Sequence, residues 1–368
     1  MRVAQVVASY HPRIGGVETH VRRIAQGCAA AGDQITVLTH RTGDEAGEEW
    51  LDSVRVLRFP LTVRSTTYPL SLTLFRYLRE HAAEFDLVHS HSYHTLVGQA
   101  AVRSRLPFVF TPHYHGTGHT PVRVVLHQLY RPVGARQFAA ADAVICVSQA
   151  ECALVGQDFP RAAGKVTTIP NGTDRRALAA GRHQGTRLVL VVGRLERYKN
   201  VDLIIRAFRG LPSLASLVIV GDGPDRARLE AMTRAGEPGW PVRFAGRIPD
   251  QQLDELLAAA TVVASASDHE AFGLMLADGL AAGAQVVASG IAAHREVGQL
   301  AGAGAPISFV DPSDTRRFTA ALDAALHRGR SRVGNVALPS WAAVACQTRE
   351  LYAQTMAGLY RTRQGEFA

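Results

Sequence analysis

Residues 267–289, SDHEAFGLMLADGLAAGAQVVAS, constrain the fold most, because they indicate a loop, a helix and a strand in immediate succession. From Phe272 to Ala282 the apolar residues recur at helical spacing, and Gly283 stands where a helix commonly ends. Gln285–Ser289 then has the length and composition of a short buried strand. Alternating helices and buried strands of this kind are typical of a parallel α/β sheet.

The start of this predicted helix has the properties of an anion-binding site. Its unpaired backbone N–H groups and the positive end of its dipole face the loop, and Gly273 lets a ligand come close to the backbone. Glu270 stands beside that site, and Asp278 follows within the helix. A carboxylate would repel a neighbouring anion, so we expect these acids to bind hydroxyl groups. Hydroxyl groups next to phosphates indicate a sugar nucleotide as the ligand.

The order Glu270, Phe272-Gly273, Asp278 resembles the signature of the family-four retaining glycosyltransferases, which have the GT-B fold. That family usually has Glu at the second acidic position, where this sequence has Asp278. The resemblance implies that Glu270 holds sugar hydroxyls and that Asp278 holds the ribose diol. The alternative is an ordinary strand–loop–helix unit in which both acids are incidental.

The chain of 368 residues is too long for one typical core and suits two domains. Its N-terminal residues indicate a strand, a Gly-containing loop, a helix and a second strand, which is the opening of a doubly wound sheet. The resemblance implies a GT-B fold, an α/β architecture of two Rossmann-like doubly wound domains that face each other across a cleft, with a C-terminal helix that crosses back. We expect an acceptor-side domain at 1–180 with the terminal helix at about 346–368, a donor domain at 181–345, and a linker near 175–186.

Gly15 and Gly16, in the segment GGVE, occupy the loop after the first predicted strand. The loop lacks G-x-G-x-x-G, so it does not indicate a nicotinamide dinucleotide. Adjacent glycines still let backbone amides approach a phosphate closely. The resemblance implies that this segment contacts the phosphates of the donor.

Several histidines follow the predicted strand at Phe108–Thr111, in the segment TPHYHGTGH. The resemblance places a Thr-x-His here that points at the donor sugar, which makes His113 the first candidate and His115 the second. Both can also be ordinary loop histidines. A zinc site built from His113, His115 and His119 is disfavoured, because the spacings are irregular for zinc and no acid stands nearby.

A second group of histidines follows the preceding predicted strand. His89, His91 and His94 lie near its carboxyl end, the edge at which open α/β sheets bind ligands. We therefore treat them as candidates for the acceptor side of the site.

The segment GRLERYKN follows the buried strand predicted at Leu188–Val192. It contains Arg194 and Lys199, and a bidentate guanidinium with a compact ammonium suits a diphosphate. The resemblance implies that both cations act on the leaving diphosphate, and that the GDGP turn and the loop at Arg247 line the base pocket. The alternative is a pair of solvated loop cations.

No Asp-x-Asp sequence occurs in the chain, which argues against a metal-chelated diphosphate. We expect no metal and no resident cofactor, since the nucleotide-diphosphate sugar is a substrate. Arg194, Lys199 and the helix start at Phe272, Gly273 and Leu274 are expected to neutralise the leaving group. The predicted catalytic residues are His113, Arg194, Lys199 and Glu270.

The composition, 47% hydrophobic and 20% charged, is that of a soluble globular protein. No segment has the character of a membrane span or a secretory signal, so we expect a cytoplasmic protein. The four cysteines have no metal-type spacing, and we expect buried thiols in a reducing compartment. They are Cys28, Cys146, Cys152 and Cys346.

The net charge of +8 is concentrated in the first half of the chain, where residues 1–182 carry 20 basic and 14 acidic side chains. A basic first domain is suited to an anionic acceptor or to peripheral contact with an anionic membrane at its inner face. A solvated, arginine-rich surface explains the charge equally well. No basic run is interleaved with aromatic residues, so we expect no nucleic acid partner. Nothing in the sequence indicates an oligomeric state.

These observations predict a retaining, metal-independent hexosyltransferase. The donor would be a UDP- or GDP-linked sugar, and the acceptor a hydroxyl of a small-molecule, natural-product or lipid-linked compound. One alternative is a sugar-nucleotide epimerase of the same architecture, which the GRL…K segment and the Trp-containing terminal helix disfavour. The other is an inactive nucleotide-sugar-binding relative, which the departure at Asp278 keeps open.

Overall fold

The computed structural model describes residues 1–13, 15–41, 43–65, 68–116, 121–174, 187–211, 215–234, 240–331 and 336–358. It contains two compact units, one formed by Met1–Asn171 with Trp341–Ala368 and the other by Gly172–Ser340. The predicted division was at 180/181, and the linker predicted near 175–186 lies outside the described residues.

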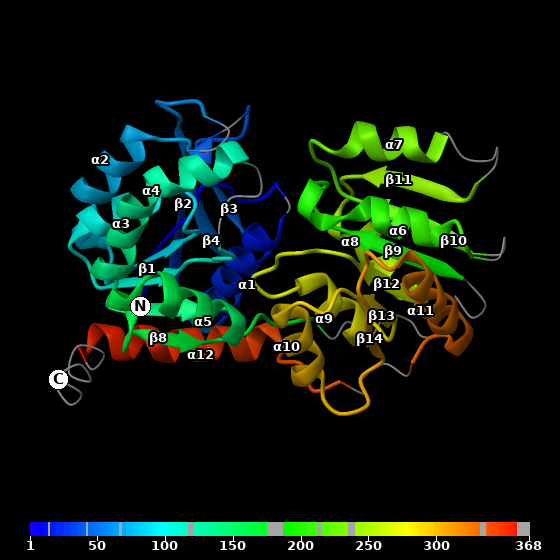
Figure 1. Cartoon of the computed structure of the whole chain (residues 1–368). Coiled ribbons are helices and arrows are strands. Elements are labelled where there is room, and N and C mark those ends of the chain that lie inside the picture. The colour runs from blue at the N-terminus through cyan, green and yellow to red at the C-terminus, as the bar shows by residue number, and fades with distance from the viewer. Residues whose placement is uncertain are drawn as a thin grey trace. The chain divides into compact units, whose positions relative to one another are not determined.

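The first unit is built on an eight-stranded sheet in the order β3-β4-β2-β1-β5-β6-β7-β8 (Figure 1). Its strands are β1 Arg2–Val6, β2 Gln34–Arg41, β3 Glu48–Leu51, β4 Val54–Pro60, β5 Leu87–His91, β6 Phe108–Thr111, β7 Ala143–Cys146 and β8 Val166–Thr168. Neighbouring strands are parallel, apart from β3 and β4, which pair antiparallel. The strand order reverses between β1 and β5, and ligands of doubly wound sheets bind at the carboxyl ends beside such a reversal.

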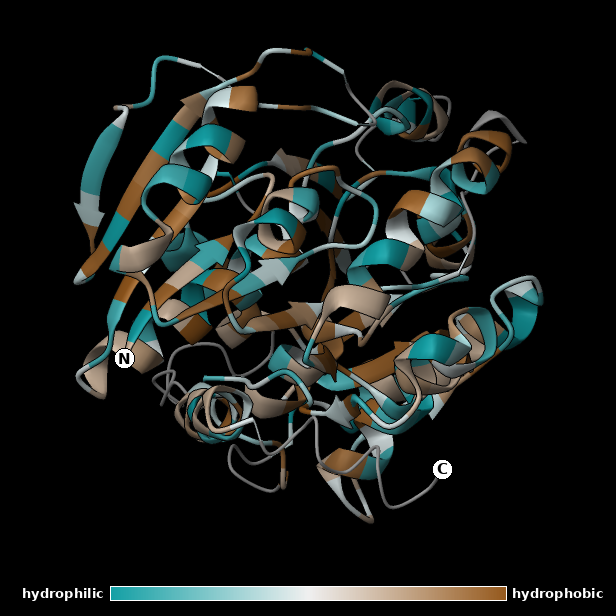
Figure 2. Cartoon of the chain, turned by 90° about the vertical axis from the view of Figure 1, so that its left-hand side faces the viewer, coloured by the Kyte–Doolittle hydropathy of each residue, from teal (hydrophilic) through white to brown (hydrophobic). Residues whose placement is uncertain are grey.

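Helices connect and cover these strands. They are α1 Gly16–Ala30, α2 Leu72–Glu80, α3 Gly98–Ser104, α4 Pro121–Ala140, α5 Gln149–Asp158 and the terminal α12 Trp341–Met356, with short 3-10 turns η1 Ala82–Glu84 and η2 Pro160–Ala162. Figure 2 shows hydrophobic colour concentrated on the strands and hydrophilic stretches along the helices. Strands covered by helices on both faces lose their exposed apolar surface, which is why β1 and β5 are almost entirely buried.

The terminal helix α12 packs against α1 within the first unit. A Cβ atom on Gly27 would lie 2.4 Å from the Cβ of Ala345, so the missing side chain permits this close approach. An ion pair adds to the packing, because Arg349 Nε lies 2.6 Å from Asp33 Oδ2. Burial alone would raise the pKa of the Asp33 carboxyl, but hydrogen bonds from Arg349 and the N-terminal amine hold that pKa below its usual range. The chain therefore returns to the first unit at its C-terminus, as the resemblance implied.

The second unit is a six-stranded parallel sheet in the order β11-β10-β9-β12-β13-β14. Its strands are β9 Leu188–Val192, β10 Ser216–Val220, β11 Val242–Gly246, β12 Val262–Ser265, β13 Gln285–Ala288 and β14 Ile307–Phe309. Its helices are α6 Val201–Phe208, α7 Arg226–Arg234, α8 Asp250–Ala259, α9 Leu274–Ala281, α10 Ala292–Ala301 and α11 Thr315–Arg328, with the short turn η3 Arg197–Lys199. The order reverses between β9 and β12, and the predicted fold class of two doubly wound α/β domains is confirmed.

Some local predictions are corrected. The helix predicted from Phe272 begins at Leu274, because Gly273 before it has a left-handed backbone with φ of 100°. The N-cap of α11 is Asp314, whose carboxylate accepts the Arg317 N–H at 3.0 Å.

The prediction of four buried thiols is wrong for two of them. Cys28 and Cys146 are buried, whereas Cys152 is half-buried and Cys346 is exposed. Cys346 lies on the outward side of α12, next in sequence to the buried Ala345. Among the described helices, none is long and apolar enough to cross a bilayer.

Candidate functional site

Three loops of the second unit are joined by backbone hydrogen bonds at the carboxyl edge of its sheet. Leu195 N–H, after β9, donates to Asp222 O, after β10, at 3.0 Å, and Gly221 N–H donates to Gly246 O at 2.7 Å. A Cβ atom on Gly221 would lie 1.9 Å from the carbonyl oxygen of Gly193, and Gly221 has φ of 124°. Only glycine fits this approach, and the hydrogen bonds hold the three loops together at this edge of the sheet.

A second set of bonds holds η3 against the loop that follows β12. Asp268 N–H donates to Tyr198 O at 2.9 Å. The amide of Asn200 donates to Ala266 O at 3.1 Å. These contacts fix the end of η3 next to the polar loop before α9.

This arrangement brings Lys199 and Glu270 together. Lys199 Nζ lies 2.5 Å from Glu270 Oε1, and the two side chains are 18% and 22% exposed. Burial alone would lower the pKa of Lys199, but the Glu270 carboxylate outweighs it and the pKa is raised. Burial likewise would raise the pKa of Glu270, and Lys199 holds it below the usual range instead. The motifs predicted separate roles for these residues, whereas the structure pairs them as charged groups.

The Glu270 carboxylate belongs to a longer polar network. Ser267 Oγ donates to Glu270 Oε1 at 3.0 Å, and Ser289 Oγ donates to Ser267 O at 2.6 Å. His294 Nδ1 lies 2.9 Å from Ser289 O. A carbonyl oxygen only accepts, so Nδ1 carries the ring proton and Nε2 has a lone pair.

His294 was not found from the sequence. It lies in α10, with Nε2 buried and without a hydrogen-bond partner among the described residues. Its ring packs on the start of α9, since a Cβ atom on Gly273 would come within 3.0 Å of His294 Cδ2. Burial lowers the pKa of His294, while Glu270 acts in the opposite direction. The sequence feature that could have indicated His294 is its place shortly after β13, the strand that follows α9.

Asp278 is the fifth residue of α9, about one turn into the helix. Thr173 Oγ1 donates to Asp278 Oδ1 at 2.6 Å, and Thr173 is buried. This hydrogen bond holds the Asp278 carboxylate in a defined position. Phe272, which was also predicted for the donor site, has its side chain buried in the second unit.

The two arginines predicted for the donor site are exposed. Arg194 Nε pairs with Glu196 Oε1 at 3.1 Å, and the Arg194 side chain is 69% exposed. Arg247 follows β11 and is also exposed. Both lie on loops at the same sheet edge as Lys199, but only Lys199 is mostly buried in an ion pair with Glu270.

Gly15 and Gly16 stand at the start of α1 in the first unit. Gly15 is the N-cap residue with extended backbone. A Cβ atom on Gly15 would lie 2.3 Å from Glu18 Oε2, whereas one on Gly16 would meet nothing within 4 Å. The Glu18 carboxylate thus covers the helix start at Gly15 and complements its dipole, while the space at Gly16 is open to a ligand.

The histidines of the first unit divide into distinct settings. His89 is buried and satisfied, with Nδ1 at 2.6 Å from the Tyr352 hydroxyl and Nε2 at 2.8 Å from Thr111 Oγ1. His94 and His115 stack with ring centroids 5.1 Å apart. His119 lies outside the described residues.

His113 lies with two other histidines at the carboxyl ends of β5 and β6. Its ring centroid is 4.8 Å from that of His20 and 6.1 Å from that of His91. His113 has a left-handed backbone with φ of 48°, which is uncommon for a residue with a side chain. The sequence singled out His113 and His91 but not His20.

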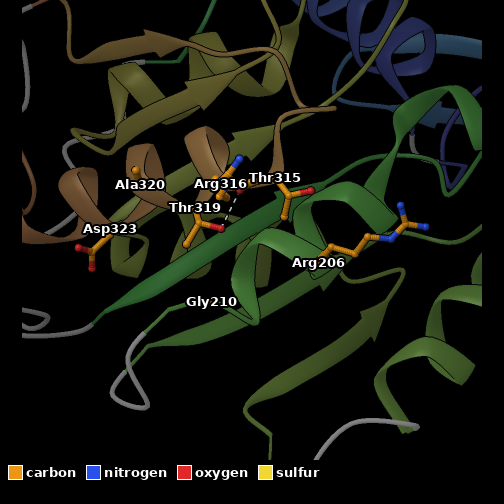
Figure 3. Close-up of a pocket in the computed structure, with 7 residues that line it drawn as sticks. All are labelled: Arg206, Gly210, Thr315, Arg316, Thr319, Ala320 and Asp323. Atoms are coloured by element: carbon orange, nitrogen blue, oxygen red, sulfur yellow. Dashed lines mark hydrogen bonds between the residues drawn. The ribbon is translucent and has the colours of Figure 1, made fainter.

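A surface hollow of about 510 Å³ lies elsewhere, between α6 and α11 (Figure 3). Arg206, Thr315 and Thr319 are among its lining residues, and none of the predicted site residues is. Figure 3 shows Thr319 bonded back to its own helix, where Oγ1 donates to Thr315 O at 2.8 Å. This hollow is therefore separate from the Lys199–Glu270 pair.

Comparison with known proteins agrees with this geometry. Residues 14–176 match the model of Glycosyltransferase Family 4, and residues 176–334 match that of Glycosyl transferases group 1. Together the two models span residues 14–334, and they identify the chain as a glycosyltransferase with two doubly wound units. The chain belongs to glycosyltransferase family 4.

Individual relatives cover most of the chain. It is 30% identical over 325 residues to the GDP-mannose-dependent alpha-(1-6)-phosphatidylinositol dimannoside mannosyltransferase of Mycobacterium tuberculosis, with 81% of each chain covered. It is 27% identical over 396 residues to the D-inositol 3-phosphate glycosyltransferase of Corynebacterium urealyticum, covering 92% of this chain and 90% of that one.

Solved structures share the fold. Sucrose-phosphate synthase from Thermosynechococcus elongatus superposes with a TM-score of 0.73 at 22% identity, covering 97% of this chain and 99% of that one. HepE from Anabaena, in complex with UDP-glucose, gives a TM-score of 0.67 at 19% identity, covering 100% and 99%.

Proposed function

We propose that this chain is a retaining hexosyltransferase that uses a UDP- or GDP-linked sugar and requires no metal for transfer. The observation that carries the proposal is the Lys199–Glu270 ion pair, at 2.5 Å, in the loops that lead to Gly273, the N-cap of α9. The ammonium suits a diphosphate and the carboxylate suits sugar hydroxyls, so one mostly buried pair supplies both kinds of contact.

The proposed reaction places growing negative charge where this unit supplies positive charge. The bond from the anomeric carbon to the diphosphate oxygen breaks, and the acceptor oxygen bonds to the same face of that carbon. The acceptor proton passes to the departing phosphate oxygen. Lys199, Arg194 and the N–H groups at Phe272–Leu274 then stabilise the leaving diphosphate.

Other residues complete the proposed donor site. Gly15 and Gly16 approach a donor phosphate, Arg247 borders the base pocket, and His113 faces the donor sugar. Support for Gly16 comes from the open space at its Cα, and for Arg247 from its place beside the interlocked glycine loops.

The donor and acceptor classes are supported by relatives. The mycobacterial relative is named as GDP-mannose-dependent, and a solved structure of the same fold holds UDP-glucose. The names of the mycobacterial and corynebacterial relatives give a phosphatidylinositol dimannoside and an inositol phosphate. We propose an inositol-containing or lipid-linked hydroxyl as the acceptor.

The test is incubation with UDP- and GDP-hexoses plus inositol phosphate or phosphatidylinositol, followed by assay of nucleotide release. NMR of the product should show the donor's anomeric configuration. An inverted configuration contradicts the retaining pathway. Interconverted sugar nucleotide without release of nucleotide supports an epimerase, and binding without either reaction supports an inactive relative.

Peripheral membrane contact through the first unit is also proposed. Leu72, Val125 and Leu129 are 55%, 62% and 73% exposed on it, and the first half of the chain has excess positive charge. Sedimentation should show binding to anionic but not neutral vesicles, weakened by salt. Leu129→Glu should weaken that binding at least about tenfold, because burying one leucine is worth about 1.5–3 kcal/mol. Equal binding to both vesicle types would contradict the proposal.

Asp278 is proposed to hold the ribose diol of the donor. Asp278→Ala should weaken donor binding by about 1–3 kcal/mol, the range for leaving a buried polar group unpaired. A 2′-deoxyribose donor should bind the native protein more weakly but lose nothing further in the variant. Calorimetric titration measures both.

Thr173→Val is the matched control for Asp278, since it removes the hydroxyl that donates to Oδ1 and keeps the carboxylate. It should weaken donor binding less than Asp278→Ala does. Equal losses from the two substitutions, with full sensitivity to the deoxy donor in both, would assign the ribose contact to another residue.

A further inference from the structure

Three histidines of the first unit converge from separate elements. His20 lies in α1, His91 ends β5 and His113 follows β6. One ring nitrogen from each lies within 4.8 Å of those of the other two. Side chains that come from three elements and meet at the carboxyl edge of a sheet form a site that no local sequence spacing specifies.

His20 is held in the tautomer of a metal ligand. Its Nδ1 lies 2.7 Å from Asn171 Oδ1. An amide oxygen only accepts, so Nδ1 donates its proton there and Nε2 keeps a lone pair. Histidines that bind metals commonly donate their second ring N–H to such an oxygen, which fixes both tautomer and ring orientation.

His91 and His113 carry unsatisfied nitrogens. His91 is fully buried, and neither of its ring nitrogens has a hydrogen-bond partner among the described residues. His113 Nε2 is likewise buried and unpaired within the described part of the chain. Buried polar atoms without partners are uncommon and point to a bound group that would satisfy them.

We propose that His20, His91 and His113 form a binding site for a divalent transition-metal ion such as Zn²⁺ or Co²⁺, with an open fourth position. Three imidazoles suit these ions, whereas Mg²⁺ and Ca²⁺ prefer oxygen ligands. Metal–nitrogen bonds of about 2.0–2.1 Å require the ring nitrogens to approach one another more closely than the 4.8 Å limit. Metal binding therefore requires side-chain rotation.

The ion has a regulatory consequence, which rests on the proposed function. His113 is the residue proposed to face the donor sugar, so a metal bound to it removes that contact. The ion should therefore inhibit transfer, and donor and metal should weaken each other's binding reciprocally. This inhibition is distinct from metal chelation of the diphosphate.

The test is titration of the untagged, chelator-stripped chain with Co²⁺. The visible d–d absorption of four-coordinate Co²⁺ should appear and saturate at one ion per chain. His91→Phe and His113→Ala should each weaken binding at least about a hundredfold, since even loss of an outer partner costs about 10–100-fold. Asn171→Ala, which removes the hydrogen-bond partner of His20, should weaken Co²⁺ binding by about 10–100-fold.

His40→Phe is the matched control. His40 is a buried histidine of β2 whose two ring nitrogens also lack partners within the described residues. Its replacement should leave Co²⁺ affinity unchanged. Circular dichroism checks that each variant is folded, and the half-buried His113 provides a second variant if His91→Phe does not fold. Absence of the absorption band, or native affinity in a folded His91→Phe or His113→Ala chain, overturns the site.

A transfer assay with added Zn²⁺ tests the consequence separately. Zn²⁺ should inhibit the native and His40→Phe chains, and chelator should restore their activity. Co²⁺ binding without inhibition overturns the regulatory role and keeps the site. The absorption measurement does not depend on turnover, so failure of the proposed transferase activity is distinguished from failure of the metal site.

Discussion

Replacing Lys199 with alanine is expected to lower kcat at least about a hundredfold while changing KM much less. The reason is that Lys199 Nζ, 2.5 Å from Glu270, is placed to stabilise charge that grows on the leaving diphosphate only as the bond breaks. A contact that strengthens in the transition state acts on kcat, whereas uniform binding acts on KM. Steady-state kinetics with a saturating acceptor measure the two separately.

Arg197 provides the matched control in the same η3 turn. Its side chain is 69% exposed and pairs with Asp225 at 3.0 Å, and it has no proposed role in transfer. Arg197→Ala should keep nearly native kcat. Native turnover in Lys199→Ala, or equal losses in both variants, would remove Lys199 from the mechanism.

Adding EDTA to the same kinetic assay tests whether transfer requires a metal. EDTA should leave kcat of the native protein undiminished, because the proposed mechanism neutralises the diphosphate with cations of the chain. Activity that EDTA abolishes and that Mg²⁺ or Mn²⁺ restores would contradict metal-independent transfer.

Local sequence patterns specify the fold well. The strands predicted at Leu188–Val192 and Phe108–Thr111 have the bounds found in the structure, because each is a continuous apolar run followed by a polar loop. The edge strand β3 was not predicted. It alternates exposed and half-buried residues and includes Trp50 at 68% exposure, so hydrophobic burial gives it a weak signal.

The candidate site was only partly predictable. Motifs indicated Lys199 and Glu270, but their ion pair joins segments 71 residues apart and depends on the bonds that fix η3. The contact of Thr173 with Asp278 spans 105 residues. His20 and His294 have ordinary helical surroundings in the sequence, and only the folded chain shows what their rings face.

The second large expected effect is on stability, and it separates the structural role of the ion pair from its chemical one. Lys199→Met leaves the Glu270 carboxylate unpaired, and Glu270→Gln leaves the Lys199 ammonium unpaired. Each should destabilise the second unit by about 3 kcal/mol, the lower end of the range for breaking a buried pair, because both side chains keep some exposure. Urea unfolding, with hydrogen exchange of β9 and β12 to assign the transition, measures this loss.

The stability of the native chain and that of the Lys199→Met variant should depend on pH in opposite directions. In the native chain Lys199 holds the pKa of Glu270 below its usual range, so this stabilisation is present above the unfolded pKa and is lost as pH falls through the folded value. In Lys199→Met burial should raise that pKa, so the folded state binds a proton and the variant gains stability from pH 8 to pH 5. In the native chain, Glu270 should add no stability as the pH falls from 8 to 5. A variant whose difference from native is independent of pH would contradict this account.

The double variant Lys199→Met/Glu270→Gln should recover much of the stability lost in either single variant, because it leaves no buried charge without a partner. Its kcat should remain at least about a hundredfold below native, since the cation for the leaving diphosphate is still absent. Recovery of folding without recovery of turnover assigns the loss of activity to the missing functional groups of the pair rather than to a disordered loop. Additive destabilisation in the double variant would instead show that the two charges are not coupled, which would contradict the ion pair as the centre of the site.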